Sequence, residues 1–299
     1  MGVTVLDAFA EEVGAEGPIV AVGGRTQFGV GGAVDPSARE VRAPSGIVEH
    51  VVAEMTARVR AGTTVAELDD ALGLHGQCVA LPAWEGATVG GVLAVGHSGL
   101  RRLGWGPVRD AVLEVRYVSA EGRLVKGGGP TVKNVSGYDL PRLFVGSLGT
   151  LGVIAEVVLR TRPVPPCEQW FMADGVDPFE LARRLYRVAS VLWDGTTTWA
   201  LLDGHPADVA EQGRVSGLRE VDATMLPVLP AHRWSLAPSE VRGLRDDGNG
   251  PFVAEVGVGV VHRTVAQPLR AVDPAVAALS ARVKAAFDPT GRLSPGRLR

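Results

Sequence analysis

Residues 144–154 read FVGSLGTLGVI, and the chain continues into the apolar segment VIAEVVLR at 153–160. The β-branched residues of that segment predict a buried strand. Glycines at 146, 149 and 152 stand directly before it. Because glycine has no Cβ, backbone at a strand end can turn its amide N–H groups towards an anion at close range. The stretch therefore predicts a close-approach loop that leads into a strand.

Two further glycine clusters support this interpretation. The first, GGRTQFGVGG at 23–32, follows a predicted strand at 19–22, and the second, GATVGGVLAVGHSG, occupies 86–99. The chain contains 39 glycines among its 299 residues. A single cluster is typical of a surface turn, but three clusters with few charges between them indicate backbone that wraps a large, flat, anionic ligand.

Two common phosphate-binding motifs are excluded. A Rossmann fingerprint needs Gly-x-Gly-x-x-Gly at the start of a helix, whereas Gly23 and Gly24 are adjacent, and Pro36 and Pro44 interrupt any helix after them. A P-loop needs Gly-Lys followed by Ser or Thr, and the sequence contains no such tripeptide. A phosphorylated ligand is therefore expected to be held in another way.

The remaining pattern predicts a mixture of strands and helices. Thr64 and Glu67 fit a capping box at the start of a helix over 64–76. The other expected helices cover 4–13, 178–190, 238–246 and 274–287, and the expected strands cover 19–22, 40–42, 56–60, 77–81, 111–120, 123–126, 153–160, 168–173, 197–203 and 252–262. Because strands and helices do not alternate strictly, the predicted fold class is α+β.

Composition narrows the range of functions. The 33 acidic and 30 basic side chains give a net charge of −3, which argues against a nucleic-acid surface. The two cysteines, Cys78 and Cys167, are too few for a disulfide framework or a chain-borne iron–sulfur cluster, and no metal site is expected. The N-terminus lacks a basic stretch before an apolar run, and no apolar segment reaches the length of a membrane span. We therefore expect a cytoplasmic location.

Five stretches of the chain resemble the VAO-type, or PCMH-type, FAD-binding oxidoreductases, and within them most closely the small FAD-binding subunits of glycolate oxidases. They are VGGRT at 22–26, GATVGG at 86–91, SGLRR at 98–102 with Gly104 or Gly106, VKNVSGYDL at 132–140 together with FVGSLGTLGVI at 144–154, and FDP at 287–289 with PG at 295–296. Three positions depart from the family pattern. Arg25 stands where the family has a third loop glycine, and His97 and Ser294 stand where it commonly has asparagine.

The resemblance implies a PCMH-type FAD-binding domain of two α+β subdomains over 1–162. A short α+β substrate or cap domain would cover 163–299, with a C-terminal helix that returns to the FAD domain. No histidine lies in 21–34, where covalent family members attach the flavin, so the FAD is expected to be non-covalent. The implied cofactor-binding residues are Gly23, Gly24, Arg25, Thr26, Gln27, Thr88, Gly90, Gly91, Ser98, Gly99, Arg102, Gly149, Gly152, Val153 and Ile154.

The resemblance also implies an activity. The chain would be an FAD-dependent oxidoreductase, or a subunit of one, that oxidises a small 2-hydroxy acid such as glycolate or D-lactate and passes electrons to a partner. The implied partners are a larger flavin subunit and an iron–sulfur subunit. The reaction needs a base for the hydroxyl proton. The candidates are His262, at the end of EVGVGVVH, and Tyr138; a structural role is the alternative for His262.

Two other interpretations remain open. The segment between Pro166 and the last predicted strand is short for a substrate domain, so the chain is alternatively a catalytically reduced subunit that binds FAD for electron relay or assembly. The other interpretation is that the chain is an enzyme similar to UDP-N-acetylenolpyruvoylglucosamine reductase, which shares this fold. That enzyme would require a Tyr-Arg-x-Ser stretch, and YRVA at 186–189 lacks the serine.

Overall fold

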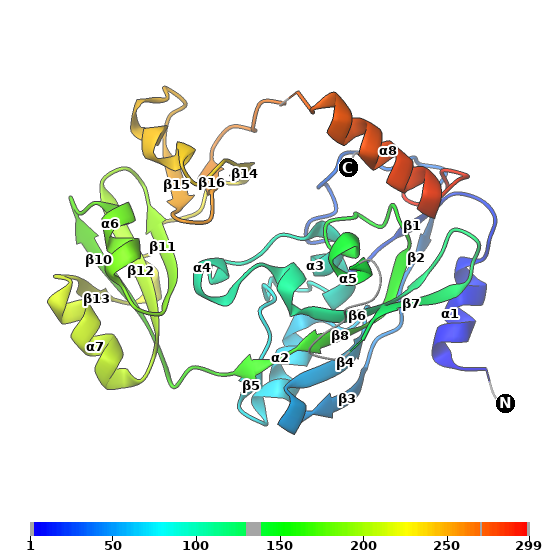
Figure 1. The fold of residues 1–299 in the computed structure, drawn as a ribbon, viewed down its shortest axis with the longest axis horizontal. Helices are drawn as coiled ribbons and strands as arrows, with labels where there is room; N and C mark the ends of the chain where they lie inside the picture. The colour runs from blue at the N-terminus through cyan, green and yellow to red at the C-terminus, as the bar shows by residue number, and fades with distance from the viewer. Residues whose placement is uncertain (1–2, 130–138, 270, 298–299) are drawn as a thin grey trace. The chain divides into compact units, whose positions relative to one another are not determined.

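The computed structural model describes residues 3–129, 139–269 and 271–297, which divide into two compact units (Figure 1). Unit 1 comprises Met1–Ser98, Pro107–Val164 and Val272–Arg299. Unit 2 comprises Gly99–Gly106 and Pro165–Ala271. Both units combine antiparallel sheets with helices, so the predicted α+β class is confirmed.

Unit 1 is built around a five-stranded antiparallel sheet in the order β3-β4-β8-β6-β7. The central strand β8 is buried over all but its last residue, which explains its continuous apolar sequence. The strands of the sheet are β3 (Ile47–Val51), β4 (Thr56–Arg60), β6 (Val112–Val118), β7 (Leu124–Gly128) and β8 (Val153–Arg160). Two short pairs accompany it: β1 (Ile19–Ala21) runs parallel to β2 (Arg39–Val41), and β5 (Gln77–Cys78) runs antiparallel to β9 (Arg162–Pro163).

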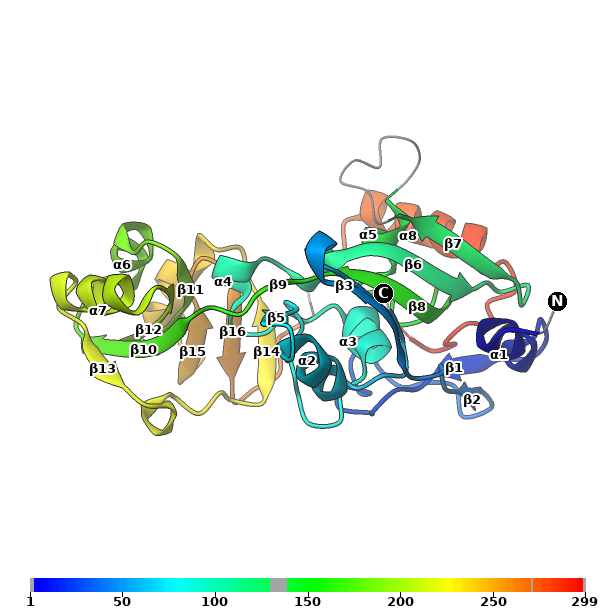
Figure 2. The ribbon, with the colours of Figure 1, turned by 90° about the horizontal axis from the view of Figure 1, so that it is seen from below.

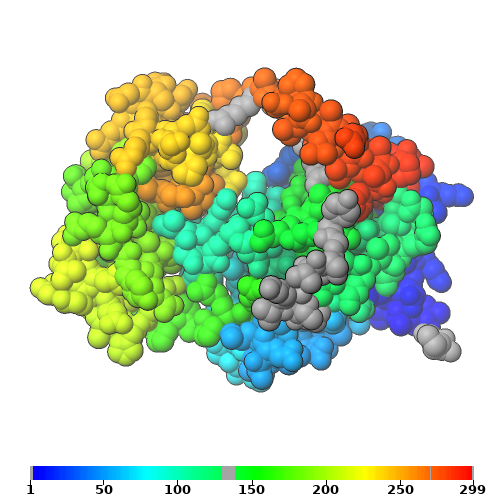
Figure 3. Space-filling model, in the orientation of Figure 1, coloured from blue at the N-terminus to red at the C-terminus, as the bar shows by residue number. Residues whose placement is uncertain are grey.

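One helix of unit 1 begins at the cap that the sequence predicts. Thr64 caps α2 and forms the predicted capping box with Glu67. Figure 2 shows α2 and α3 beside the sheet, and their apolar residues share one core with β4, β6 and β8. The helices are α1 (Val5–Val13), α2 (Val65–Gly73), α3 (Val89–Val95), α5 (Leu140–Phe144) and α8 (Pro274–Phe287), with short 3-10 turns η1 (Val52–Glu54) and η2 (Val108–Ala111). The whole of α8 is described and none of its residues is buried, so it forms part of the visible surface of unit 1 (Figure 3).

Unit 2 is a seven-stranded antiparallel sheet in the order β13-β10-β12-β11-β15-β16-β14. Apolar residues of α6, α7 and η4 pack on one face of it. The strands are β10 (Cys167–Asp174), β11 (Val188–Trp193), β12 (Thr197–Gly204), β13 (Arg219–Val221), β14 (His232–Ser235), β15 (Phe252–Glu255) and β16 (Val260–Arg263). The helices are α4 (Arg102–Trp105), α6 (Pro178–Arg184) and α7 (Pro206–Val215), with 3-10 turns η3 (Ala223–Met225) and η4 (Glu240–Asp246).

Two predictions for unit 2 are wrong. The strand expected over 252–262 is a hairpin, because Gly257 and Gly259 adopt left-handed φ angles of +80° and +82° and reverse the chain between β15 and β16. The helix expected over 178–190 ends at Arg184, and the apolar run that follows is β11, which is buried on both faces. A short apolar run has no period that separates a buried strand from a helix.

Other differences concern the type, the length or the existence of single elements. The helix expected over 238–246 is the 3-10 segment η4, and the strand expected over 77–81 is limited to β5. The sequence did not predict β3, β13, β14, α5 or α7. Residues 89–95, interpreted above as part of a glycine loop, form helix α3 behind the N-cap Thr88. Gly90 serves the packing of that helix, since a Cβ there would lie 2.7 Å from the Cβ of Ala61.

Candidate cofactor site

Unit 1 contains two adjoining cavities that are partly open to solvent. Residues 21–28, α3 and Leu148 contribute to the larger cavity, and the starts of α3 and β8 to the smaller one. The two cavities share the lining residues Ala21, Gly23, Thr88, Gly91 and Ala94. They therefore form adjacent compartments along one wall of the unit.

Twelve of the fifteen predicted cofactor-binding residues line these cavities. The larger is lined by Gly23, Gly24, Arg25, Thr26, Gln27, Thr88 and Gly91. The smaller is lined by Gly23, Thr88, Gly90, Gly91, Gly149, Gly152, Val153 and Ile154. The fold thus brings together three glycine clusters that lie far apart in the sequence, at 23–32, 86–99 and 146–152.

The loop over residues 23–27 presents a run of backbone donors. The amide of Val22 donates to Val41 O (2.9 Å), and the amide of Phe28 donates to Arg25 O (3.3 Å). Between them, the five amide N–H groups of residues 23–27 have no hydrogen-bond acceptor among the residues that the structure describes. Successive backbone N–H groups around a concavity form an anion-binding environment without needing a lysine.

Gly23 and Gly24 leave no room for a side chain, because neighbouring residues of the protein lie against them. A Cβ on Gly23 would lie 2.1 Å from Thr88 Oγ1, and a Cβ on Gly24 would lie 1.7 Å from Gly86 O. Loop 23–27 therefore lies directly against the residues that precede α3. Because Gly23 and Gly24 have no side chains, the backbone of this loop can lie against residues 86–88. Residues on both sides of this contact line the larger cavity.

Thr88 lines both cavities, and its hydroxyl group can still donate a hydrogen bond. Its Oγ1 accepts from the Gly91 amide (3.2 Å), while the Val89 and Gly90 amides donate to Thr63 O and Ala61 O. The first amides of α3 are thus already paired inside the protein. A hydroxyl that accepts one bond still carries its own hydrogen, so Thr88 contributes its O–H as a donor at the cavity wall.

Two arginines place positive charge at the larger cavity. Arg25 pairs with Glu40 and lies over the Phe28 ring, 4.8 Å from its centroid. Arg297 lies over the same ring at 4.6 Å and donates to the carbonyls of Phe28 and Val30. Burial lowers the pKa of the Arg297 guanidinium, yet an arginine remains charged at neutral pH. Glu40 offsets the Arg25 charge, whereas among the described residues Arg297 makes no ion pair with a carboxylate, so the Arg297 charge favours an anionic occupant.

Arg25 adopts a backbone conformation that suits glycine. Its φ is +58°, in the left-handed region. This explains why the family pattern has glycine there, because a side chain costs roughly 1 kcal/mol in that region. Ser294, with φ +47°, is a second such position, and asparagine, which the family commonly has there, tolerates this region better than serine.

At the smaller cavity, the start of β8 extends past the end of its neighbour β4. The register of β4 with β8 ends with Arg60 opposite Glu156, and the Ala61 amide adds one bond to Ala155 O. Val153 and Ile154 therefore lie beyond the paired length of β4 and line the cavity.

Three predicted cofactor residues lie elsewhere. Ser98 is buried and its Oγ accepts from the Val108 amide at 3.2 Å, which makes it a structural link within unit 1. Gly99 and Arg102 belong to unit 2. Tyr138 lies outside the described residues. His262, in unit 2, has its Nε2 3.1 Å from Glu255 Oε1.

Several lining residues were not predicted, among them Trp84, Leu148 and Arg297. Arg297 directly follows the Pro-Gly of the C-terminal signature, so its position next to that motif could have identified it as a site residue. Leu148 lies inside the FVGSLGTLGVI stretch and has a φ of +54°. Trp84 has no signal beyond its position two residues before the GATVGG turn.

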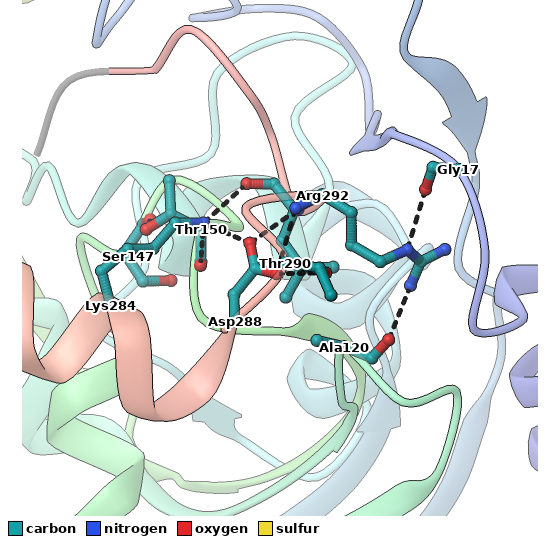
Figure 4. A network of polar contacts seen from close by, with 9 residues as sticks. Gly17, Ala120, Ser147, Thr150, Lys284, Asp288, Thr290 and Arg292 are labelled. Atoms are coloured by element: carbon teal, nitrogen blue, oxygen red, sulfur yellow. Dashed lines mark hydrogen bonds and ion pairs between the residues drawn. The ribbon is translucent and has the colours of Figure 1, made fainter.

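Polar contacts of the C-terminal signature join residues 284–293 to the segment before β8 and to the N-terminal region of unit 1 (Figure 4). The buried Asp288 accepts from Lys284 Nζ and from the amides of Arg292 and Leu293. The Lys284 ammonium also donates to Thr150 O at 2.8 Å, within the glycine stretch before β8. The network therefore holds the segment that carries Ser294 and Arg297 at the cavity.

Within the described residues, no helix is both long enough and apolar enough to span a membrane. The described residues include no group of three or more His, Cys, Asp or Glu side chains that could hold a metal ion.

Comparisons with known proteins agree with this geometry. The family model described as "FAD binding domain" matches residues 5–128. The chain is 36% identical over 164 residues to "Glycolate oxidase subunit GlcE" of Escherichia coli (strain K12), covering 54% of this chain and 47% of that protein. It is 46% identical over 104 residues to "D-lactate dehydrogenase" of Archaeoglobus fulgidus, covering 34% of this chain and 24% of that protein. The matches thus span less than half the length of these curated relatives.

A solved structure shows the same fold over nearly the whole chain. Alkyldihydroxyacetonephosphate synthase superposes with a TM-score of 0.68 at 14% sequence identity, covering 97% of this chain and 73% of that chain. At this identity the likeness concerns the fold alone.

The cavities also fit the cofactor that the family model names. FAD carries a pyrophosphate, which suits the unpaired amides of residues 23–27 and the Thr88 hydroxyl, and it carries flat rings, which suit walls of small apolar residues such as Ala21 and Ala94. Residues 5–128 therefore match an FAD-binding domain, and the cavities of unit 1 suit that cofactor.

Proposed function

We propose that this chain binds FAD non-covalently in the two adjoining cavities and acts as an FAD-dependent oxidoreductase, or a subunit of one, on a small 2-hydroxy acid. The observation that carries the proposal is the run of five amides at 23–27 without protein acceptors, beside two cavities that share Thr88. Such a run, in a concave site flanked by Arg25 and Arg297, suits a pyrophosphate.

The division of work among the residues follows from their chemistry. The amides of 23–27 and the Thr88 hydroxyl would bind the pyrophosphate, and the apolar surfaces of Ala21, Ala94 and Ile154 would contact the flat rings. Non-covalent binding is supported because residues 21–34 contain no histidine, and neither Cys78 nor Cys167 is among the lining residues of the two cavities. When bound, FAD would supply a two-electron acceptor.

The substrate class is supported by the names of the relatives. Glycolate and D-lactate, which those names contain, are both small 2-hydroxy acids. Oxidation of such a molecule needs a cation for its carboxylate and a base for its hydroxyl proton. We propose that residues 163–299, apart from the C-terminal segment, supply these groups as a substrate domain.

The partners are proposed from the same names. Two relatives are called subunits of glycolate oxidase, which supports a complex with another flavin-containing chain. An iron–sulfur subunit as the electron acceptor and a cytoplasmic location remain predictions from the sequence.

The cofactor part is tested by FAD titration. The purified protein should be yellow and should release its flavin on acid precipitation. Thr88→Val removes the proposed O–H donor and the α3 cap together, so the dissociation constant for FAD should rise at least tenfold, as for loss of a hydrogen bond to a charged group. Thr64→Val is the matched control, because it removes the equivalent cap of α2 without touching either cavity. A colourless wild-type protein that ignores added FAD would overturn the proposal.

The activity is tested by anaerobic mixing of the yellow protein with glycolate or D-lactate. Bleaching of the flavin by the isolated chain supports catalysis by this chain. Bleaching that appears only after a co-purified partner is added assigns the chain to electron relay, and the catalytic part of the proposal then falls.

A further inference from the structure

Unit 2 has a pocket of its own that is open to solvent. It is lined by the loop after β10, the start of α6, the end of β11 and two residues of η4. All of its lining residues belong to unit 2, and none of them lines the two cavities of unit 1. The pocket is therefore a site separate from the candidate cofactor site.

The two arginines of η4 that line the pocket share one side of that helix. Arg242 and Arg245 are three residues apart, and a 3-10 helix has three residues per turn, so side chains at this spacing lie one above the other. Val241 and Leu244 have the same spacing and are buried in the core of unit 2. The apolar pair thus anchors η4, while the arginine pair is left at the pocket.

Aromatic rings support both guanidinium groups. The Arg242 guanidinium lies over the Phe179 ring, 4.0 Å from its centroid, and the Arg245 guanidinium lies over the Trp193 ring, 5.2 Å from its centroid. Stacking uses the flat face of a guanidinium group and leaves the N–H groups in its plane able to bind a carboxylate or a phosphate. The rings therefore position the two cations without using their hydrogen-bond donors.

The arginine charges are only partly compensated. Among the described residues, Arg245 makes no hydrogen bond or ion pair with another side chain. The Arg242 guanidinium lies 3.8 Å from Asp177 Oδ2, which is longer than a hydrogen bond. The other oxygen of Asp177 accepts from the amides of Phe179 and Glu180. The residues that line the pocket thus carry two positive charges and one negative charge.

A buried indole N–H provides a further donor. Trp193 lines the pocket, is 3% exposed, and among the described residues its buried Nε1 has no hydrogen-bond partner. Trp199 and Trp234, which belong to the same sheet, both donate to backbone carbonyls. Because a buried N–H without an acceptor is costly, the unpaired Nε1 is a second and independent indication that an acceptor binds here.

We propose that this pocket binds a small oxyanion, a carboxylate or a phosphate, between the guanidinium groups of Arg242 and Arg245, with one anion oxygen accepting from the indole N–H of Trp193. The anion is a small molecule because it has to enter the pocket to reach an indole that is almost completely buried. The proposal goes beyond the proposed function, since neither FAD nor the cavities of unit 1 take part in it.

Anion binding is tested by isothermal titration of the full chain with sodium phosphate and, separately, with sodium succinate, both at constant ionic strength. At least one of the two should bind saturably, and the tighter one identifies the class of oxyanion. Arg242→Met and Arg245→Met should each weaken that binding about tenfold or more, as for loss of a hydrogen bond to a charged group. No saturable binding by the wild type, or equal binding by the wild type and both variants, would overturn the proposal.

Arg214→Met is the matched control. Arg214 is an exposed arginine of α7 that pairs with Glu211 and does not line the pocket, so its loss changes the net charge by the same amount. Weakening of the same size in this control would mean that only net charge matters, and the site would be refuted. Arg245→Lys keeps the charge without the planar donors and should bind more tightly than Arg245→Met but more weakly than the wild type. Because these side chains are exposed, each variant should retain the melting temperature of the wild type within about 2 °C.

The indole N–H provides a readout that non-specific anion binding does not move. The chain has six tryptophans and hence six indole N–H signals in a ¹⁵N–¹H spectrum, and Trp193→Phe identifies the Trp193 signal by its loss. The bound anion should shift that signal downfield, with the same midpoint as the calorimetric titration. In Arg245→Met the shift should require about tenfold more anion. A Trp193 signal that stays in place while the anion binds would contradict the placement of the anion in this pocket.

Discussion

Gly24 and Gly86 meet so closely that a Cβ on Gly24 would lie 1.7 Å from the carbonyl oxygen of Gly86. The loop that presents the unpaired amides is therefore held by contact with the residues before α3. Gly24→Ala must push these two backbone segments apart, and overpacking of this kind costs about 1–3 kcal/mol. We expect a lower melting temperature and loss of FAD from the variant, measured by flavin absorbance after gel filtration.

Gly29→Ala provides the control for that experiment. Gly29 lies in the same glycine cluster, its φ is not in the left-handed region, and a Cβ there would meet no atom within 4 Å. Stability should change by less than about 0.5 kcal/mol, as for ordinary surface substitutions. Loss of FAD from both variants to the same degree would show that the Gly24–Gly86 contact is not special.

Ser294 tests the cost of left-handed backbone beside the cavity. Its φ is +47°, its amide donates to Ile19 O at 2.7 Å, and among the described residues its buried Oγ has no partner. Ser294→Gly and Ser294→Ala both remove the hydroxyl, but only alanine keeps a Cβ in this conformation. The glycine variant should be about 1 kcal/mol more stable than the alanine variant. Equal stability in urea denaturation would contradict the assigned backbone conformation.

Glu114 predicts a pH-dependent stability. The carboxylate is fully buried; burial raises its pKa, but hydrogen bonds and charges from Arg58 (2.8 Å) and Lys126 (3.0 Å) outweigh that effect and bring the pKa below its ordinary 4.5. A lowered pKa means that the stabilisation is present above pH 4.5 and is lost as the pH falls through the folded-state value. Glu114→Gln should therefore cost about 3–5 kcal/mol at pH 7 and progressively less in acid.

Urea denaturation between pH 7 and pH 3 measures this difference. The curves of wild type and Glu114→Gln should converge as the pH falls, because protonation removes the same charge from the wild type. Glu49→Gln, on the exposed side of β3 in the same sheet, should leave the pH profile unchanged. Parallel curves for wild type and Glu114→Gln down to pH 3 would refute the assignment.

The Arg292 side chain links the C-terminal segment to residues 13–17 near the N-terminus, and we expect its loss to destabilise the protein strongly. Its guanidinium donates to five backbone carbonyls at 2.8–3.1 Å, and Figure 4 shows two of these bonds, to Gly17 and Ala120. Arg292→Met would leave several buried acceptors unpaired, at a cost of about 3 kcal/mol or more. Arg39→Met removes only an exposed bond to the Glu12 carbonyl and a part-buried bond to the Val13 carbonyl, and should cost about 1 kcal/mol. Similar melting temperatures for the two variants would exclude this role of Arg292.

Local chemistry explains what the sequence could predict. The capping box of Thr64 and Glu67 lies within four residues, and the apolar run of β8 is buried on both faces, so both signals are complete in a short window. The same holds for the glycine clusters, whose spacing excluded a Rossmann site and a P-loop without any knowledge of the fold. The clusters indicated a large, flat, anionic ligand, and the resemblance of five stretches to FAD-binding oxidoreductases implied that this ligand is FAD.

Predictions failed where a short window fits two structures. The apolar residues of β11 have no period that excludes a helix, and only pairing with β12 and β15 makes them a strand. The run EVGVGVVH reads as one strand, but Gly257 and Gly259 turn it into a hairpin. That turn places Glu255 and His262 on one face, which no spacing in the sequence shows.

The sequence by itself indicated an FAD-binding domain, the fold class and the residue types of the candidate cofactor site, because glycine and capping signals act over a few residues. Only the tertiary structure decided what each of these residues touches. It placed Gly24 against Gly86 and turned Ser98 inward to Val108, and it grouped Arg102 with unit 2. The physical reason is that backbone conformation is set locally, whereas contacts between distant segments follow from the burial of apolar surface by the whole chain.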